Sequence, residues 1–270
     1  MIRDITIGQY YPADSVIHKL DPRVKLFSTM IYIIALFMFK GIAGIALITI
    51  FLAGVIKISK VPFRYIVKGL KAVMMLLAMT ATFNVLFTAG DNMLFQYGII
   101  KISTVGITNA ILMSIRLIYL IIGTSLMTLT TTPNQLTDGL ETSLSPFNKI
   151  GVPVHAVAMM MSIALRFIPI LIEETDKIMK AQMARGADFE NGNIIKRAKN
   201  MVPLLVPLFI SAFRRADDLA MAMEARCYNG GEGRTKMKPL KYSKYDYRAY
   251  MVSLLFLIGV IALRFVPSFF

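Results

Sequence analysis

The chain has 270 residues, of which 56% are hydrophobic, and it carries a formal net charge of +14. A mean hydropathy of +0.62 is too high for a soluble globular domain and predicts an integral membrane protein. In such a protein the basic excess is typical of a cytoplasmic face near anionic lipid, so nucleic-acid binding is not expected, and the single cysteine, Cys227, excludes an internal disulfide.

Residues 1–25 are predicted to form a cytoplasmic N-terminal segment. They are polar and include Asp4, Asp14 and Asp21, at positions where a cleavable signal peptide would be apolar. We therefore expect no signal peptide, and the first membrane span to begin at about residue 26.

Residues 26–129 are predicted to contain four transmembrane helices. The apolar run 26–58 is too long for one ordinary crossing, and Lys40 and Gly41 interrupt it, which favours two spans joined by a tight turn. The runs 70–88 and 107–129 are each close to the roughly 20 residues that a hydrocarbon core requires.

The basic residues between these spans predict their orientation. The loop after the second span carries a cluster of them, namely Lys57, Lys60, Arg64, Lys68 and Lys71. The loops after the first and third spans carry only Lys40 and Lys101. Because Lys and Arg are enriched in cytoplasmic loops, the N-terminus is predicted to be cytoplasmic.

Residues 130–248 are predicted to form a cytoplasmic or interfacial region. Thr132, Pro133 and Gln135 have the pattern of a capping box and predict the start of a short helix. The segment 152–172 is apolar enough to cross the membrane, but crossing would put the fifteen Lys and Arg residues of 177–248 outside. The positive-inside rule favours a helix in the interface, with a spanning helix as the alternative.

Two long amphipathic helices are expected within this region, at about 170–185 and 203–226, and each becomes polar toward its C-terminal end. Residues 249–270 are predicted to form the final transmembrane helix and a short outer tail. The fold predicted is therefore an all-α integral membrane protein with about five transmembrane helices and long cytoplasmic amphipathic helices.

A repeated motif closes both amphipathic helices. The segments Ala181–Gly186 and Ala222–Cys227 both read Ala-x-x-Ala-Arg. Small residues three apart share one helix face, where another surface can approach, and the arginine supplies five donors in a planar fork. A single copy would be an ordinary helix ending, but two copies favour a paired docking surface.

The sequence has few patterns that indicate catalysis, nucleotide binding or metal binding by this chain. Residues 230–233, Gly-Gly-Glu-Gly, lack the lysine and hydroxyl of a phosphate loop, so ATP binding is not expected. His18 and His155 lack partners at metal-ligand spacing and are predicted to be interfacial or core residues. Arg116, inside the fourth span, is a candidate functional charge, for which we favour a structural role.

Three features together resemble one family. They are the entry segment 8–25, which begins Gly-Gln-Tyr-Tyr-Pro-Ala-Asp, the segment Leu165-Arg-Phe-Ile-Pro169, and the two arginine motifs. They resemble the transmembrane T component (EcfT/CbiQ family) of energy-coupling factor (ECF) transporters, and the resemblance covers essentially the whole chain.

The resemblance implies a non-catalytic scaffold of an ABC-type importer for micronutrients in a bacterial or archaeal plasma membrane. It implies two cytoplasmic ABC ATPase subunits that bind ATP and grip the long coupling helices, a membrane S component that captures substrate, and no cofactor in this chain. The implied ATPase-docking residues are Ala184, Arg185, Gly186, Ala225, Arg226 and Cys227. Cys227 departs from the glycine of the family motif, and because cysteine tolerates a positive φ less readily, the second turn could differ from the first.

Other readings stay open. Overall similarity favours a vitamin transporter over a dedicated cobalt or nickel transporter, and the unequal motifs hint at two different ATPases. A stand-alone permease would need a polar route through the spans. A membrane enzyme would need a catalytic cluster, for which Asp14, His18, Asp21 and Glu141 are the candidates.

Overall fold

The computed structural model describes residues 10–39, 41–88, 93–97, 100–187, 189, 194–230, 237 and 239–265. By their contacts, the described residues fall into two compact units. We call Gly8–Gly139 with Leu240–Phe270 the core unit, and Leu140–Pro239 the long-helix unit. The chain passes from one to the other within α6 and returns just before α9.

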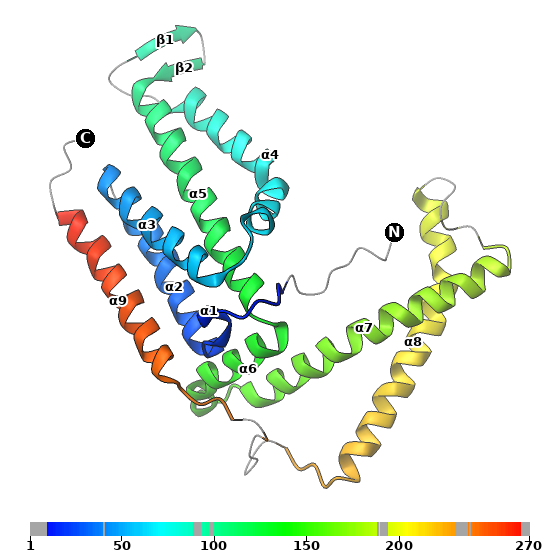
Figure 1. Cartoon of the computed structure of the whole chain (residues 1–270). Coiled ribbons are helices and arrows are strands. Elements are labelled where there is room, and N and C mark those ends of the chain that lie inside the picture. Colours follow the sequence, from blue (N-terminus) through cyan, green and yellow to red (C-terminus); the bar gives the residue numbers. More distant parts are fainter. Residues whose placement is uncertain are drawn as a thin grey trace. The chain divides into compact units, whose positions relative to one another are not determined.

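The core unit contains most of the helices. They are α1 (Val16–Lys19), α2 (Pro22–Met38), α3 (Gly41–Ser59), α4 (Phe63–Phe87), α5 (Thr104–Thr130), the first part of α6 (Pro133–Leu144), and α9 (Lys244–Phe265). Figure 1 shows α2, α3, α5 and α9 packed side by side, with α4 against α5. The buried centre of this bundle includes Tyr32, Leu36, Ile48, Leu126 and Phe256.

The break predicted in the first apolar run is confirmed. Phe39 caps α2 by donating its backbone N–H to the Ala35 carbonyl at 3.1 Å, and α3 begins at Gly41, whose φ is +68°. Glycine adopts this left-handed conformation without steric cost, so the chain can reverse there. Lys40, the predicted interruption, lies outside the described residues.

Within the described residues, α3, α5, α7 and α9 are long and apolar enough to cross a membrane. A fifth candidate is α4, which is bent by 61° between Phe63–Lys71 and Val73–Phe87. The bend separates a basic first segment from the apolar span predicted to begin at residue 70. With 17 residues, α2 is slightly shorter than these helices.

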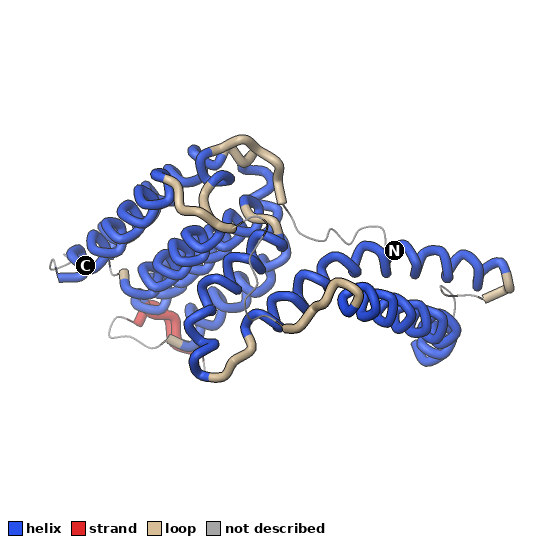
Figure 2. The backbone as a smooth tube through the Cα atoms, turned by 90° about the horizontal axis from the view of Figure 1, so that it is seen from below, coloured by secondary structure: helices blue, strands red, loops and turns tan. Residues whose placement is uncertain are grey.

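A hairpin of β1 (Met93–Tyr97) and β2 (Ile100–Ser103) links α4 to α5 and was not predicted. The strands are antiparallel, with Tyr97 opposite Ile100. Aromatic and β-branched residues favour strands in a segment too short for a membrane helix. Figure 2 shows that this hairpin is the only sheet in the described part of an otherwise helical chain.

The N-terminal segment caps the C-terminal end of α5. Tyr11 donates its backbone N–H to the Leu129 carbonyl at 2.9 Å, and the Lys25 amine donates to the Thr130 carbonyl at 2.8 Å. The last carbonyls of a helix have no intrahelical partner, so these bonds satisfy groups that would otherwise be buried and unpaired.

The long-helix unit is formed by the end of α6, a 3₁₀ turn at Ser145–Ile150, α7 (Val154–Ala184) and α8 (Ile194–Glu224). α7 joins the apolar segment 152–172 and the amphipathic segment 170–185 into one continuous helix. α7 and α8 pack antiparallel, since Glu174 pairs with Arg215 at 3.1 Å and the Gln182 amide donates to the Pro203 carbonyl at 3.5 Å.

The contact between Gln182 and Pro203 has a local cause. Pro207 lies four residues after Pro203 inside α8 and has no N–H, so the Pro203 carbonyl lacks its intrahelical partner. The Gln182 side chain from α7 occupies that vacant acceptor. The last turn of α7 is thereby tied to a proline-containing stretch of α8.

Candidate functional site

The first arginine motif is the C-terminal cap of α7. The Ala187 N–H donates to the Gln182 carbonyl at 3.0 Å, and the Gly186 N–H donates to the Met183 carbonyl at 2.9 Å. Gly186 has a φ of +87°. These paired bonds around a left-handed residue define a Schellman cap, with Arg185 as the C-cap residue.

The second motif has the same cap at the end of α8. The Tyr228 N–H donates to the Met223 carbonyl at 3.0 Å, and the Cys227 N–H donates to the Glu224 carbonyl at 2.8 Å. Cys227 occupies the position of Gly186 and has a φ of +56°. The possible difference in turn geometry at Cys227 is therefore not observed, because the cap's hydrogen bonds hold the cysteine in the left-handed conformation.

Both caps present their side chains outward. All six motif residues are exposed, and among the described residues neither Arg185 nor Arg226 forms an ion pair. A guanidinium at a helix C-terminus is favoured by the helix dipole. It also keeps its planar set of donors available for a carboxylate or carbonyl of another molecule.

The two motifs lie at opposite ends of an antiparallel helix pair. Gln182, in the first motif, contacts Pro203, and α8 continues from there to Glu224, which lies within the second motif. At 1.5 Å per residue this stretch of helix is about 30 Å long. The arginines are therefore far apart on the long-helix unit, so a docking surface that includes both motifs would consist of two separate parts.

A cavity adjoins the second motif and was not anticipated from sequence. Its volume is about 380 Å³, and it is lined by Met159 and Ile163 of α7, Met223 of α8, and Arg226 and Cys227. The first and last of these residues are distant in sequence, and only the antiparallel packing brings them together. The end of α8 thus combines the guanidinium of Arg226 with an adjoining cavity that is lined in part by apolar side chains.

The residues considered for a membrane enzyme have separate local partners. Asp14 forms an exposed ion pair with Lys19 at 2.8 Å, and this lysine lowers the pKa of Asp14. Glu141 pairs with His155 at 2.8 Å in the long-helix unit. In the described ranges, no three His, Cys, Asp or Glu side chains are grouped as metal ligands.

His18 is buried in the core unit. Its Nδ1 lies 2.6 Å from the Ser15 hydroxyl, and its Nε2 lies 3.0 Å from the Tyr11 carbonyl. Burial lowers the pKa of His18, and the charge of Lys25 lowers it further. The neutral ring satisfies both contacts by donating from Nε2 and accepting at Nδ1, which is a structural arrangement.

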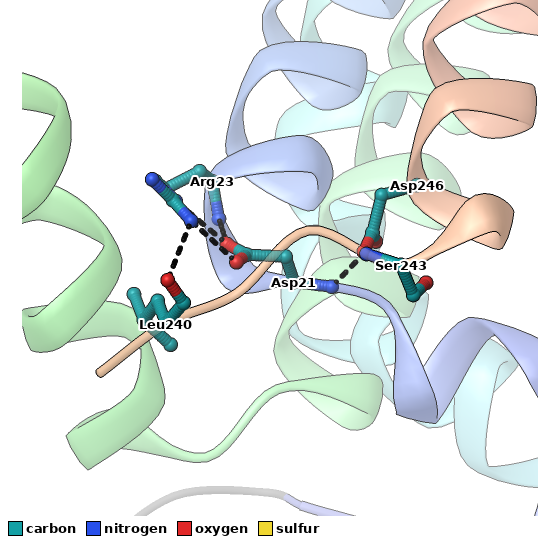
Figure 3. Close-up of polar contacts among 5 residues, drawn as sticks. All are labelled: Asp21, Arg23, Leu240, Ser243 and Asp246. Carbon is teal, nitrogen blue, oxygen red and sulfur yellow. Dashed lines mark hydrogen bonds and ion pairs between the residues drawn. The ribbon is translucent and has the colours of Figure 1, made fainter. Parts of the chain in front are cut away.

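Asp21 belongs to a polar junction between the start of α2 and the start of α9 in the core unit (Figure 3). Its carboxylate accepts from the Arg23 guanidinium at 2.8 Å, and Arg23 also donates to the Leu240 carbonyl at 3.4 Å. Burial alone would raise the pKa of Asp21, but the bonds from Arg23 outweigh it and lower that pKa. The backbone N–H of Asp21 donates to the carboxylate of Asp246 at 2.8 Å.

Arg116 lies among aromatic rings of the core unit. Its guanidinium is 4.9 Å from the ring centroid of Phe39 and 5.9 Å from that of Phe37. Among the described residues, its buried Nε has no hydrogen-bond partner. Cation–π contacts of this kind hold a charge against a packed helix, which supports the structural role expected for Arg116.

Comparisons with known proteins agree across most of the chain. The sequence model of one family, described as cobalt transport protein (CbiQ), matches residues 13–237. A relative in Clostridium kluyveri is 58% identical over 94% of each chain, and one in Thermosediminibacter oceani is 51% identical over 98% of this chain and 100% of its own. One in Bacillus subtilis is 47% identical over 97% of this chain and 98% of its own. Each is named energy-coupling factor transporter transmembrane protein EcfT.

Proposed function

The chain belongs to the CbiQ family of cobalt transport proteins, and we propose that it is the energy-coupling transmembrane subunit of an ECF-type importer. In this role it catalyses no reaction itself. Two cytoplasmic ABC ATPases bind and hydrolyse ATP, and this chain transmits their movement to a membrane S component that carries the substrate.

The observation that carries the proposal is the repeated cap. Two helices end in the same Schellman geometry, each with an exposed arginine that has no ion-pair partner among the described residues. One such end would be an ordinary terminus. Two ends on opposite sides of one helix pair suit a motor of two subunits, each of which takes one arginine into a groove lined by carboxylates or carbonyls.

An exposed apolar stripe on α8 supports the proposed transmission of movement to an S component. Val202, Val206, Phe209 and Phe213 follow helical spacing and are each more than half exposed. A soluble surface would not leave these side chains in water. In the proposed complex this stripe faces the S component or lipid, so a tilt of α8 driven by its capped end would move the S component.

The experiment is co-purification of this chain with its host's ABC ATPases in detergent. We compare the unchanged chain with Arg185→Glu, Arg226→Glu and the double variant. Because each arginine contacts one ATPase, each single variant is expected to lose about half of the bound ATPase, and the double variant nearly all of it. Reversing a charge at a desolvated pair costs several kcal/mol, enough to abolish binding.

Arg214→Glu is the matched control, because Arg214 is an exposed arginine of the same helix α8 outside the motif. It is expected to retain both ATPases. Equal ATPase capture by the double variant and the control would contradict docking through the caps. If the unchanged chain captures no ATPase, transport by the chain alone and turnover of lipid substrates test the permease and enzyme alternatives.

The substrate class follows from the S component and not from this chain. We propose vitamins as the cargo, with cobalt or nickel as the rival. Identification of the S proteins that co-purify with the unchanged chain, followed by uptake assays with each, distinguishes the two.

A further inference from the structure

The core unit contains a cavity whose lining includes no residue of either arginine motif. Its volume is about 350 Å³, within the range of ligand-binding pockets. It is lined by residues of α1, α2, α3, α5 and α9. It begins where α2 and α9 start, the predicted cytoplasmic end of the bundle, and extends along α2 from Lys25 to Tyr32, about 10 Å at 1.5 Å per residue.

The inner part of this cavity is apolar and is formed by packed aromatic rings. Tyr32 and Phe51 form its floor, with Phe256 stacked 4.1 Å from Phe51 behind them. The Tyr32 hydroxyl donates to the Tyr119 carbonyl at 2.8 Å, so its polar atom is satisfied away from the cavity. Gly123 allows this ring to lie across α5, since a Cβ at Gly123 would overlap the Tyr32 ring.

The outer part of the cavity is cationic. Lys25 lines it, and its amine is held by the carbonyls of His18 and Thr130 and not by a carboxylate. Arg248 lines it from α9, next to the exposed ring of Tyr245, and forms no ion pair with any described residue.

Two acids lie near Lys25, and their negative charges favour its protonated form. Asp21 is paired with Arg23, and Asp246 accepts hydrogen bonds from two backbone N–H groups. Neither residue lines the cavity. An occupant that complements the whole site therefore has an apolar tail and an anionic head.

We infer that this cavity binds one anionic phospholipid, with part of an acyl chain against Tyr32 and Phe51 and the phosphate beside Lys25 and Arg248. Basic pockets between membrane helices on the cytoplasmic side are suited to such headgroups. The bound lipid fills the space between α2, α3, α5 and α9 and so holds α2 and α9 in register.

The test uses the purified full chain and native mass spectrometry, which counts retained lipids. Phosphatidylglycerol and phosphatidylcholine with identical acyl chains are compared, and glycerol 3-phosphate is added as a competitor that has the headgroup chemistry without the tails. The expected result is one retained phosphatidylglycerol, preferred over phosphatidylcholine and not displaced by millimolar glycerol 3-phosphate.

Two variants test the contact with the lipid headgroup and the contact with its acyl chain separately. Arg248→Gln is expected to lower the preference for phosphatidylglycerol about fivefold, since one basic residue near a membrane surface contributes about 1 kcal/mol. Val252→Trp fills the cavity from α9 and is expected to reduce retention of both lipids. Arg264→Gln, at the opposite end of α9, is the matched control and should leave both values unchanged.

Equal effects of Arg248→Gln and Arg264→Gln would overturn the inference, as would unchanged retention by a correctly folded Val252→Trp variant. Displacement by glycerol 3-phosphate would identify a site for free phosphate compounds and would overturn it as well. Helical circular dichroism and gel filtration verify folding, and Arg248→Gln decides the question if Val252→Trp does not fold.

Discussion

The two caps differ in the residue that occupies their left-handed position. Gly186 and Cys227 occupy equivalent positions with φ of +87° and +56°. A side chain in this region costs about 1–2 kcal/mol in an L-residue, so the cap of α8 carries a strain that the cap of α7 avoids. No atom of the described residues lies within 4 Å of a Cβ built on Gly186, so among them only the backbone conformation would oppose a side chain there.

An exchange of these residues tests the strain. Gly186→Cys is expected to destabilise the end of α7 by about 1 kcal/mol, and Cys227→Gly is expected to stabilise the end of α8 by a similar amount. Hydrogen exchange of the amides at residues 185–187 and 226–228 measures both effects. Faster exchange at the end of α8 in Cys227→Gly would show that the cysteine side chain stabilises this cap by contacts in the adjoining cavity.

At the scale of elements, the junction of α2 and α9 depends on one buried carboxylate. Asp246 is 1% exposed and accepts from the backbone N–H of Asp21 at 2.8 Å and of Ser243 at 2.6 Å. It thus caps its own helix α9 and also binds the residue that caps α2. Arg23 strengthens the same junction through the Leu240 carbonyl and the ring of Tyr242, which lies 4.0 Å away.

Asp246→Ala should destabilise this junction strongly. The buried N–H of Asp21 would lose its acceptor, at about 1–3 kcal/mol, and the more exposed N–H of Ser243 would lose its bond at the start of α9. We expect a lower thermal midpoint of unfolding in detergent, and a smaller decrease for Asp246→Asn, which keeps one acceptor oxygen. Asp14→Ala removes an exposed ion pair and serves as the control with an unchanged midpoint. Equal midpoints for Asp246→Ala and this control would refute the role of the carboxylate.

At the scale of the whole molecule, the separation of the two caps determines how partners can bind. Within the long-helix unit the antiparallel packing of α7 and α8 puts the caps at opposite ends, so one partner domain would have to extend over about 30 Å to cover both arginines. This geometry is a reason to expect two ATPase subunits, and it does not require them to be identical.

The separation can be measured with spin labels. Cys227 is the only cysteine of the chain and is exposed, so Ala187→Cys supplies the second label site. Antiparallel packing predicts about 40 Å between the labels. This value is the length of the part of α8 that runs from the point nearest residue 187 to Cys227, at 1.5 Å per residue. A separation near 20 Å would mean that the two caps share one surface.

The amino-acid sequence by itself determined the features that depend on neighbours along the chain. The break near Gly41 follows from local composition, and the capping box at Thr132 and Gln135 forms as predicted, with reciprocal bonds of 3.2 and 3.3 Å. The apolar runs identify the long helices, and the repeated motif identifies the two helix ends. These signals are local because the hydrogen bonds of a helix join residues four apart.

Only the tertiary structure decided which distant residues meet. Asp21 and Asp246 are 225 positions apart, and nothing in either segment specifies the other as its partner. The antiparallel pairing of α7 and α8, which separates the two arginines and forms the cavity at Met159, likewise depends on packing. Side-chain packing and burial act between residues that the chain brings together only after folding, so spacing along the sequence cannot reveal them.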